Sequence, residues 1–218
     1  MFIHGSAAGS EAMYWSILDE QRQRALPALG FCRGEGFYLA GGTALALRIG
    51  HRDSVDFDFF KSDGFDTALL FEQLREAFGG STLVKVQDER NTLSVVAADS
   101  IKLSFMSYTY PLLQPLVSTE HLDLADIADI GCMKLAAITG RGTMKDYVDL
   151  YFILQRMSLQ ELLALCAVKL PQLDRALILK ALVYFDDLDS EPILYTKDHS
   201  IAFEDVKKFL MAQARKGY

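Results

Sequence analysis

A diglycine turn followed by an Asp-x-Asp pair constrains this chain more than any other feature. Gly41-Gly42-Thr43 follows a short apolar run at 37–40, which predicts a strand, and opens a run at 42–49, which predicts a helix. The glycines are therefore expected at a helix N-terminus, where backbone N–H groups have no intrahelical partner and a ligand can approach closely. Such a turn is suited to hold the oxygens of a phosphate.

The Asp-x-Asp pair follows after twelve further residues. Residues 55–60 alternate in type, and on a strand of period two this places Asp56 and Asp58 on one face and Val55 with the phenylalanines on the other. Two carboxylates about 7 Å apart at their side-chain bases can reach one divalent cation. Asp-x-Asp alone is more often a solvated strand face, but together with the glycine turn it favours a metal site that acts on a nucleoside triphosphate.

Composition and charge exclude several classes of protein. The net charge of -7 argues against a protein that binds nucleic acid with its whole surface. A local basic patch is still compatible with it, and its candidates around the proposed site are Arg48, Arg52, Arg141 and Lys145. Three cysteines without a paired spacing argue against a disulfide framework and a structural zinc site. No apolar run is long enough to span a bilayer and residues 1–10 lack the pattern of an export signal, so we predict a cytoplasmic protein with no membrane contact.

The predicted elements divide the chain into a mixed part and a helical part. A helix from Glu11 to about Gly30, broken near Pro27, comes first. Strands are then predicted at 37–40, 55–60, 82–88, 92–98 and 101–107, and helices at 42–49, 66–78, 124–139, 146–156, 158–169, 171–183 and 202–215, with Pro171 at a helix start. We place a domain boundary near residue 118, between an α/β domain at 1–118 and a helical domain at 119–218.

Two predicted core faces contain charged residues. Lys134 lies in the middle of the apolar stripe of the helix at 124–139. Its side chain must therefore extend to solvent at the edge of the stripe, lose its proton or pair with an anion. Asp146 and Asp149 share a face of the next helix, which is apolar nearly all round. Helix-start electrostatics can explain one of these aspartates. Pairing with Lys134 or an arginine, or a role at the metal and phosphate site, are the other interpretations.

Several ordered motifs together resemble a known family, the AbiEii/AbiGii-type nucleotidyltransferase toxins. They are found at 41–45, 51–60, 134–137 and 145–151, and the resemblance covers roughly residues 35–185. It implies an α+β, nucleotidyltransferase-like fold, with a small mixed β-sheet and helices followed by a C-terminal helical domain that closes the cleft. It also implies a toxin that transfers a nucleotide to an RNA or another target and is restrained by a separately encoded antitoxin.

The resemblance assigns roles to specific residues. The expected activity is Mg²⁺-dependent transfer of a nucleoside monophosphate from an NTP to an acceptor hydroxyl, with the end of a tRNA as the RNA acceptor. Lys134 is expected to neutralise charge on the leaving group, and Asp146 to orient Lys134 or to help activate the acceptor. The complete expected set is Gly41, Gly42, Thr43, Arg52 and Ser54 for nucleotide binding, Asp56 and Asp58 for the metal, and Asp58, Lys134 and Asp146 for catalysis.

One departure from the family pattern keeps a second hypothesis open. Relatives usually have a third carboxylate on a later strand, at the position of Ser104 in this sequence. A hydroxyl is a poorer metal ligand and a poorer base than a carboxylate. The alternative is therefore a catalytically weakened relative that binds a nucleotide or a partner. A structural protein, whose Asp-x-Asp pair is only a solvated strand face, is a third hypothesis.

Overall fold

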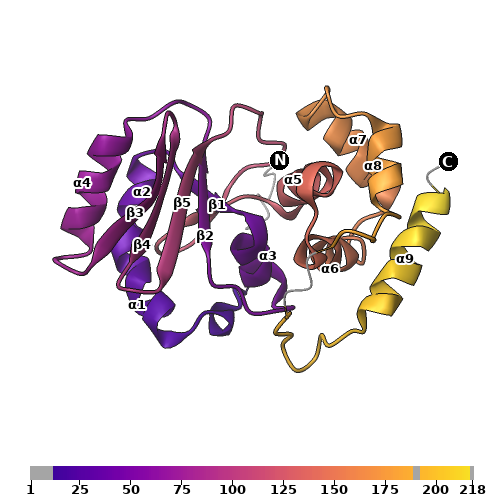
Figure 1. Ribbon diagram of the computed structural model, residues 1–218, viewed down its shortest axis with the longest axis horizontal. Helices are drawn as coiled ribbons and strands as arrows, with labels where there is room; N and C mark the ends of the chain where they lie inside the picture. The colour runs from indigo at the N-terminus through magenta and orange to yellow at the C-terminus, as the bar shows by residue number, and fades with distance from the viewer. Residues whose placement is uncertain (1–11, 189–191, 217–218) are drawn as a thin grey trace, which may run out of the picture.

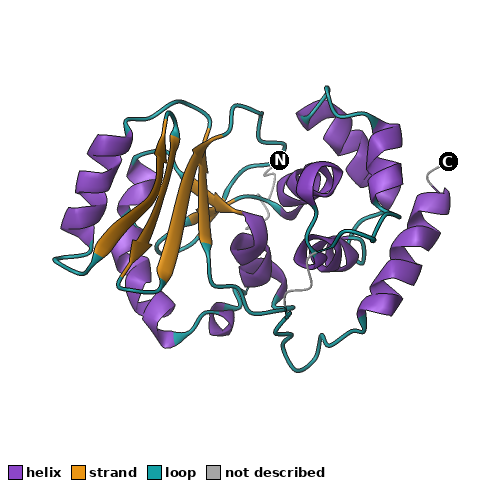
Figure 2. Ribbon diagram, viewed as in Figure 1, coloured by secondary structure: helices purple, strands orange, loops and turns teal. Residues whose placement is uncertain are grey.

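The computed structural model describes residues 12–188 and 192–216, and its first part is a sheet flanked by helices (Figure 1). Figure 2 shows the strands gathered on one side of the molecule. The first part contains the 3₁₀ helix η1 (Trp15–Ile17), helices α1 (Glu20–Leu29), α2 (Phe31–Gly34), α3 (Gly41–Ile49) and α4 (Thr67–Ala77), and strands β1 (Tyr38–Ala40), β2 (Phe57–Lys61), β3 (Leu83–Glu89), β4 (Thr92–Ala97), β5 (Ile101–Ser107), β6 (Val117–Ser118) and β7 (Asp123–Leu124).

The second part of the chain is helical. It contains α5 (Ile127–Arg141), α6 (Met144–Ile153), α7 (Leu159–Lys169), α8 (Arg175–Ala181) and α9 (Phe203–Lys216). Asp126 caps α5, and capping boxes begin α6 at Thr143 and α7 at Ser158. These side chains accept from N–H groups that the first turn of a helix leaves without partners. The predicted α+β class, a mixed sheet with helices followed by a helical part, is confirmed.

The strand that bears Asp58 lies in the middle of the sheet. The described strands form one sheet in the order β3-β4-β5-β2-β1-β7-β6. β2 pairs antiparallel with β1, where Asp58 lies opposite Ala40, and parallel with β5, where Asp58 lies opposite Ser104. Phe57 and Phe59, on either side of Asp58 in sequence, are 0% and 1% exposed. Their burial fixes the register, because a shift by one residue would turn these rings to the opposite face.

Helix α3 connects the sheet to the helical part. α1, α2 and α4 lie on one side of the sheet in Figure 1, whereas α3 lies on the other and contacts β1, β2, α5 and α6. Residues 44–47 in α3 are fully buried, as expected for a helix that is apolar on every side. The N-terminus of α3 is thereby held where the sheet and the helical part meet.

The first predicted helix is shorter than its sequence pattern indicates. α1 begins at Glu20 because Asp19 caps it, accepting the N–H of Arg22 at 2.8 Å, and residues 15–17 form η1 instead. Pro27 lies inside α1 rather than ending it. Glu11, the predicted start, is outside the described residues.

Helix α8 also begins later than predicted, at Arg175 rather than Pro171. Asp174 accepts the N–H groups of Ala176 and Leu177 at 2.6 and 3.1 Å, and this cap decides the start. Among the described residues, no helix combines the length and the apolar composition that crossing a bilayer requires.

The domain boundary near residue 118 stays a prediction. β7 lies beyond it, yet Leu124 of β7 pairs in parallel with Leu39 of β1. The first residues of the proposed helical domain therefore complete the sheet, and they join the two parts of the chain directly.

Candidate active site

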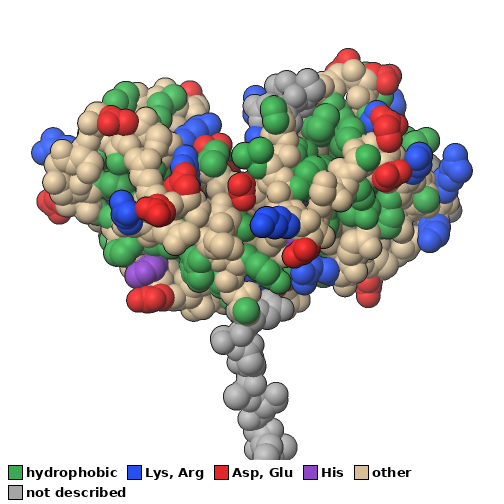
Figure 3. Space-filling view, turned by 90° about the horizontal axis from the view of Figure 1, so that it is seen from below, with side chains coloured by type: hydrophobic (Ala, Val, Ile, Leu, Met, Phe, Trp, Pro, Cys, Tyr) green, Lys and Arg blue, Asp and Glu red, His purple; other side chains and the backbone are tan. Residues whose placement is uncertain are grey.

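A cleft of about 600 Å³ lies between the sheet and the helical part. Side chains from the α3 turn, the loop before β2, strands β2 and β5, helices α5 and α6 and the segment 192–194 line it. In Figure 3 the molecule is notched between its two halves, and acidic and basic side chains gather near the base of the notch. The predicted residues that line this cleft are Gly42, Thr43, Arg52, Ser54, Asp56, Asp58, Lys134 and Asp146.

The diglycine turn places backbone close to the charged groups of the cleft. Gly41 has a φ of +68°, and a Cβ there would lie 3.0 Å from Oδ2 of Asp58. A Cβ at Gly42 would collide with the Arg52 guanidinium. Any other residue would therefore strain the backbone or displace these groups. The predicted position of the turn, at the N-terminus of a helix, is confirmed.

The hydroxyls of Thr43 and Ser54 hold the loop before β2 against α3. Their oxygens lie 2.7 Å apart, and Thr43 also donates to the carbonyl of Asp56. Both hydroxyls are buried or nearly so, with the two residues 1% and 9% exposed. These contacts fix the backbone that leads from the glycine turn to the aspartate pair.

Asp56 and Asp58 both line the cleft, but only Asp58 belongs to the strand. Burial raises the pKa of Asp58, and the negative charge of Asp56 raises it further. Lys134, Lys102 and a hydrogen bond from Ser104 oppose this rise without cancelling it. The predicted strand at 55–60 begins only at Phe57, so the prediction that Val55 shares a strand face with the phenylalanines is wrong, and Val55 is 49% exposed.

The aspartate pair fits a divalent cation that is also held by substrate oxygens. Burial raises the pKa of Asp58 most and repulsion from Asp56 adds to it, and a bound cation would offset both effects. Among the described residues no group of three His, Cys, Asp or Glu side chains could hold a metal by itself. Mg²⁺ commonly uses one or two carboxylates and completes its shell with water and phosphate oxygens. Asp56 and Asp58 would be the protein ligands.

Lys134 meets two carboxylates rather than solvent. Its Nζ lies 2.8 Å from Oδ1 of Asp146 and 2.6 Å from Oδ2 of Asp149, and the residue is 8% exposed. Burial would lower the pKa of Lys134, but the charges of Asp149 and Asp146 outweigh burial and raise it. Of the three outcomes considered for this lysine, the structure shows pairing with anions. The ammonium remains charged at the wall of the cleft.

Asp146 has both of the roles that its position suggested. Its Oδ2 accepts from the backbone N–H and the hydroxyl of Thr143 at 2.9 and 3.0 Å, which caps α6, while its Oδ1 accepts from Lys134. Helix capping and pairing are therefore compatible in one carboxylate. Asp146 and Lys134 both line the cleft, so their ion pair forms part of its wall.

Asp149 is the centre of this charged cluster, and it is fully buried. Its Oδ1 accepts from Nε of Arg52 and Nε2 of His51, both at 2.8 Å. Its Oδ2 accepts from Nη2 of Arg52 at 2.9 Å and contacts the Lys134 ammonium. A carboxylate has about four acceptor sites, so this one is saturated. Asp149 can position Lys134 and Arg52 but has no free lone pair for a metal or a proton.

Burial and charge set the protonation of the groups around Asp149. Burial alone would raise the pKa of Asp149, but Arg52 and Lys134 hold it well below its usual range. Burial lowers the pKa of His51 despite its hydrogen bond to Asp149. His51 is therefore neutral at pH 7 and donates through Nε2, and its fully buried position agrees with a structural role. Arg52 also donates to the carbonyl of Asp53 at 3.0 Å, which leaves two of its five N–H groups for a ligand.

The predicted basic patch is present only in part. Arg52, Arg141 and Lys145 line the cleft, whereas Arg48 lies elsewhere and pairs with Asp126 at 3.6 Å. Lys102 of β5 also lines the cleft, two residues before Ser104. An alternating strand pattern could have indicated it, because Lys102 and Ser104 share a strand face.

The segment 192–194 is a wall of the cleft that the sequence did not predict. The Asp53 N–H donates to the Leu194 carbonyl at 2.8 Å, and the Thr196 N–H donates to the His51 carbonyl at 3.2 Å. Arg52 and Tyr195 form an antiparallel bridge between these contacts. This loop lies roughly 140 residues after its partner, and no local pattern indicates such a pairing.

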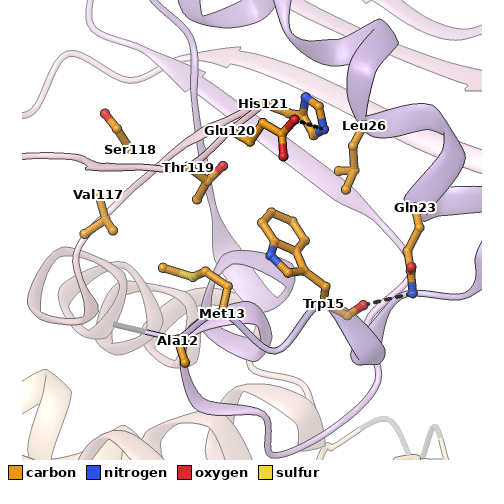
Figure 4. Close-up of a pocket in the computed structure, with 10 residues that line it drawn as sticks. All are labelled: Ala12, Met13, Trp15, Gln23, Leu26, Val117, Ser118, Thr119, Glu120 and His121. Atoms are coloured by element: carbon orange, nitrogen blue, oxygen red, sulfur yellow. Dashed lines mark hydrogen bonds and ion pairs between the residues drawn. The ribbon is translucent and has the colours of Figure 1, made fainter. Parts of the chain in front are cut away.

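Another cavity, of about 480 Å³, has different chemistry (Figure 4). Trp15, Met13 and Leu26 form part of its wall, and Glu120 approaches His121 at 3.9 Å. Within residues 12–188 and 192–216, Glu120 is the one carboxylate that lines it. The described lining of this cavity has neither a carboxylate pair nor a buried lysine, so we place the candidate active site in the cleft.

Comparisons with known proteins identify the family of this chain. A family model described as "Nucleotidyl transferase AbiEii toxin, Type IV TA system" matches residues 33–215. The chain belongs to the AbiEii nucleotidyltransferase toxin family. It is thus a nucleotidyltransferase, a class of enzyme that generally uses an NTP and a divalent metal ion. Every predicted site residue of this AbiEii protein lies within the matched range.

Individual relatives agree with this membership. An uncharacterized protein of Aquifex aeolicus (strain VF5) is 37% identical over 204 residues, which span 90% of this chain and 95% of that protein. The nucleotidyltransferase toxin MenT4 of Mycobacterium tuberculosis H37Rv has a TM-score of 0.59 at 18% identity, over 89% of this chain and 82% of MenT4. JHP933 of Helicobacter pylori has a TM-score of 0.54 at 19% identity, over 94% of this chain and 92% of JHP933. At these identities the two structures support the fold.

Proposed function

We propose that this AbiEii protein transfers a nucleoside monophosphate from an NTP to a hydroxyl of RNA, with Mg²⁺ as cofactor and the end of a tRNA as the acceptor. The observation that supports this most strongly is the meeting of the Asp56 and Asp58 pair with the Lys134 and Asp146 pair in one cleft. These groups come from the two parts of the chain. A cleft that combines them could bind a triphosphate through Mg²⁺ and stabilise the negative charge that develops on the leaving group.

The phosphate end of the NTP is proposed to bind at the start of α3. The backbone N–H groups at Gly41 and Gly42, with Thr43 beside them, begin a helix, where anions are favoured. Arg52 would add its two remaining N–H groups, and Ser54 lies on the same wall. Asp56 and Asp58 would hold Mg²⁺, which supplies positive charge to the phosphate oxygens and lines up the α-phosphorus.

The transfer step forms one bond and breaks one. The acceptor oxygen bonds to the α-phosphorus, the bond to the bridging oxygen breaks, and pyrophosphate leaves with the electron pair. Lys134 would neutralise the charge that develops on the pyrophosphate, and Asp146 and Asp149 keep its ammonium charged and in place. Asp58 would act through the Mg²⁺ that it holds, which would favour ionisation of the attacking hydroxyl, and the proton of that hydroxyl would pass to solvent water.

The identity of the acceptor and the partner rests on family and charge. Lys102, Arg141 and Lys145 line the cleft and suit a phosphate backbone, although the chain as a whole is acidic. The family description names a type IV toxin–antitoxin system, and MenT4 is described as a toxin. We therefore propose a cytoplasmic toxin with a cognate antitoxin.

Ser104 favours a second candidate, a weakened enzyme that acts by binding. Ser104 lies in register with Asp58 and donates to it, at the place where a third carboxylate is expected. Under this hypothesis the cleft binds Mg²⁺ and NTP without turnover. Binding does not separate the two candidates, because both predict it.

Labelled transfer separates them. The protein is incubated with Mg²⁺, total RNA and NTPs labelled at the α-phosphate. Label is expected in RNA with wild type, to be lost with Asp58→Asn and with EDTA, and to persist with Asp88→Asn, an exposed carboxylate on β3 away from the cleft. Binding of NTP by wild type without any transfer to RNA would support the weakened enzyme instead.

A further inference from the structure

Two of the large apolar side chains that line the cleft are exposed rather than buried. Val55 is 49% exposed and Leu194 is 64% exposed, and both line the cleft with the half-buried Ile193. We call these three residues the apolar shelf. Single exposed apolar residues are common on proteins and need no explanation. Here they gather in one concave site beside charged groups, as in a ligand site where apolar walls accompany a few polar anchors.

The backbone fixes the apolar shelf next to the proposed phosphate site. Leu194 accepts the Asp53 N–H at 2.8 Å, and the hydroxyl of Thr196 donates to the Gly50 carbonyl at 2.7 Å. Val55 directly follows Ser54, whose hydroxyl contacts Thr43 at the start of α3. The shelf and the phosphate anchors therefore belong to one short stretch of the chain and its bonded partner segment.

The chemistry of an NTP decides which of its parts suits this shelf. The triphosphate is a polyanion and the ribose has several hydroxyls, so neither gains from contact with Val55 or Leu194. The base has two flat faces of low polarity, and removing them from water against aliphatic side chains is favourable. The shelf side chains have no hydrogen-bonding groups, so they detect the presence of a base without distinguishing one base from another.

We propose that Val55, Ile193 and Leu194 form the subsite for the base of the incoming NTP. This inference rests on the function proposed above, because the phosphates must first bind at the α3 turn. The segment before α9 would then be a part of the active site and not only a connection between helices. Affinity for the base would come from the shelf and affinity for the phosphates from the metal and the turn.

The test compares NTPs with inorganic tripolyphosphate, which has the phosphates but no base. Affinities for both are measured with Mg²⁺ by calorimetry for wild type, Leu194→Asn, and Val55→Thr with Leu194→Asn. The substitutions are expected to weaken binding of all four NTPs by about tenfold and to leave tripolyphosphate binding unchanged. Leu177→Asn on α8 and Val86→Thr on β3 replace residues that are 45% and 61% exposed away from the cleft, and they should change neither affinity.

Each other result overturns the proposal and identifies what failed. Equal weakening of NTP and tripolyphosphate would show that the segment supports the phosphate site. Unchanged affinity for both, with a raised KM for RNA, would assign the shelf to the acceptor. Absence of tripolyphosphate and NTP binding in wild type would overturn the proposed function and this inference together, whereas binding of both that the substitutions do not affect would overturn this inference alone.

Discussion

Two buried lysines in the helical part show how similar local chemistry can have different purposes. Lys134 is 8% exposed and bonds to Asp146 and Asp149, whereas Lys169 is fully buried and bonds to Asp129 at 2.7 Å. Both ammoniums are compensated by carboxylates, as burial requires. Lys134 lines the cleft and Lys169 does not. Burial of a charge therefore does not by itself indicate function, and access to a ligand-sized space makes the difference.

The cluster around Lys169, which we call the closed cluster, is buried and does not reach the cleft. Lys169 also donates to the Pro111 carbonyl at 2.7 Å, and Asp129 accepts the N–H groups of Leu113 and Gln114 at 3.0 to 3.2 Å. These bonds hold the loop that follows β5 against α5 and α7. Both side chains are fully buried and neither lines the cleft, so the effect of this pair should be on stability.

The largest expected effect is on the closed cluster. Lys169→Met leaves the Asp129 carboxylate buried with backbone partners only, and we expect the free energy of unfolding to fall by about 3–5 kcal/mol. Urea unfolding followed by circular dichroism measures this. Transfer activity per folded molecule should stay that of wild type. A stability loss below 1 kcal/mol, by the same measurement, would show that the two clusters are not different in this way.

Lys134→Met should have the opposite balance of effects, with a large loss of activity and a smaller loss of stability. Its kcat is expected to fall by about 10²–10³-fold, because a positive charge at the leaving group is lost. The stability loss should be smaller than for Lys169→Met, since Asp149 keeps Arg52 and His51 and water in the cleft can reach Asp146. Transfer rates at saturating NTP test the expected loss of kcat, and urea unfolding curves for both variants test the expected difference in stability. A kcat near that of wild type would remove Lys134 from the mechanism.

The pH dependence of stability should reflect Asp149. Its folded pKa is well below the ordinary value of 3.8, so the unfolded chain takes up a proton first as the pH falls. The stability that Asp149 contributes is present above that value and is lost as the pH falls towards the folded pKa, by at most about 1.4 kcal/mol per pH unit. Unfolding measured at several acidic pH values should show a shallower decline for Asp149→Asn. An unchanged slope would mean that other carboxylates dominate.

The smallest expected effect comes from adding a negative charge to the cleft, beside Asp58. Ser104→Asp places a third carboxylate beside Asp58, which should lower the Mg²⁺ concentration for half-maximal activity by about fivefold, close to 1 kcal/mol. Without Mg²⁺ the variant should be less stable than wild type, because like charges then repel. A Mg²⁺ titration of activity, with thermal unfolding in EDTA, tests both parts. A higher Mg²⁺ requirement would show that Ser104 does not occupy a ligand position.

Local sequence patterns predicted the elements that depend on near neighbours. Alternation in 101–107 gave β5, and the glycines at the start of α3 were found because a helix N-terminus has a short signature. The start of α1 was missed because Asp19, a capping residue, was outweighed by a longer amphipathic pattern. Such competition between local signals is what sequence patterns resolve least well.

The charged cluster could be predicted only in part. The spacing of Asp146 and Asp149 indicated inward carboxylates and Lys134 indicated an anion nearby, and the structure shows them in contact. That Asp149 also binds Arg52, 97 residues away, follows from the tertiary fold and from no local pattern. For the same reason the sequence did not indicate the pairing of Lys169, at the end of the predicted helix 158–169, with Asp129.

The most direct test of this account is one assay on three proteins at equal folded concentration: wild type, Lys134→Met and Lys169→Met. Transfer of α-phosphate label from NTP to RNA is measured with Mg²⁺ present. The account predicts transfer by wild type and Lys169→Met at the same rate, and transfer at least about 10²-fold slower by Lys134→Met. Equal rates for the two variants would contradict the claim that only the cluster in the cleft takes part in catalysis.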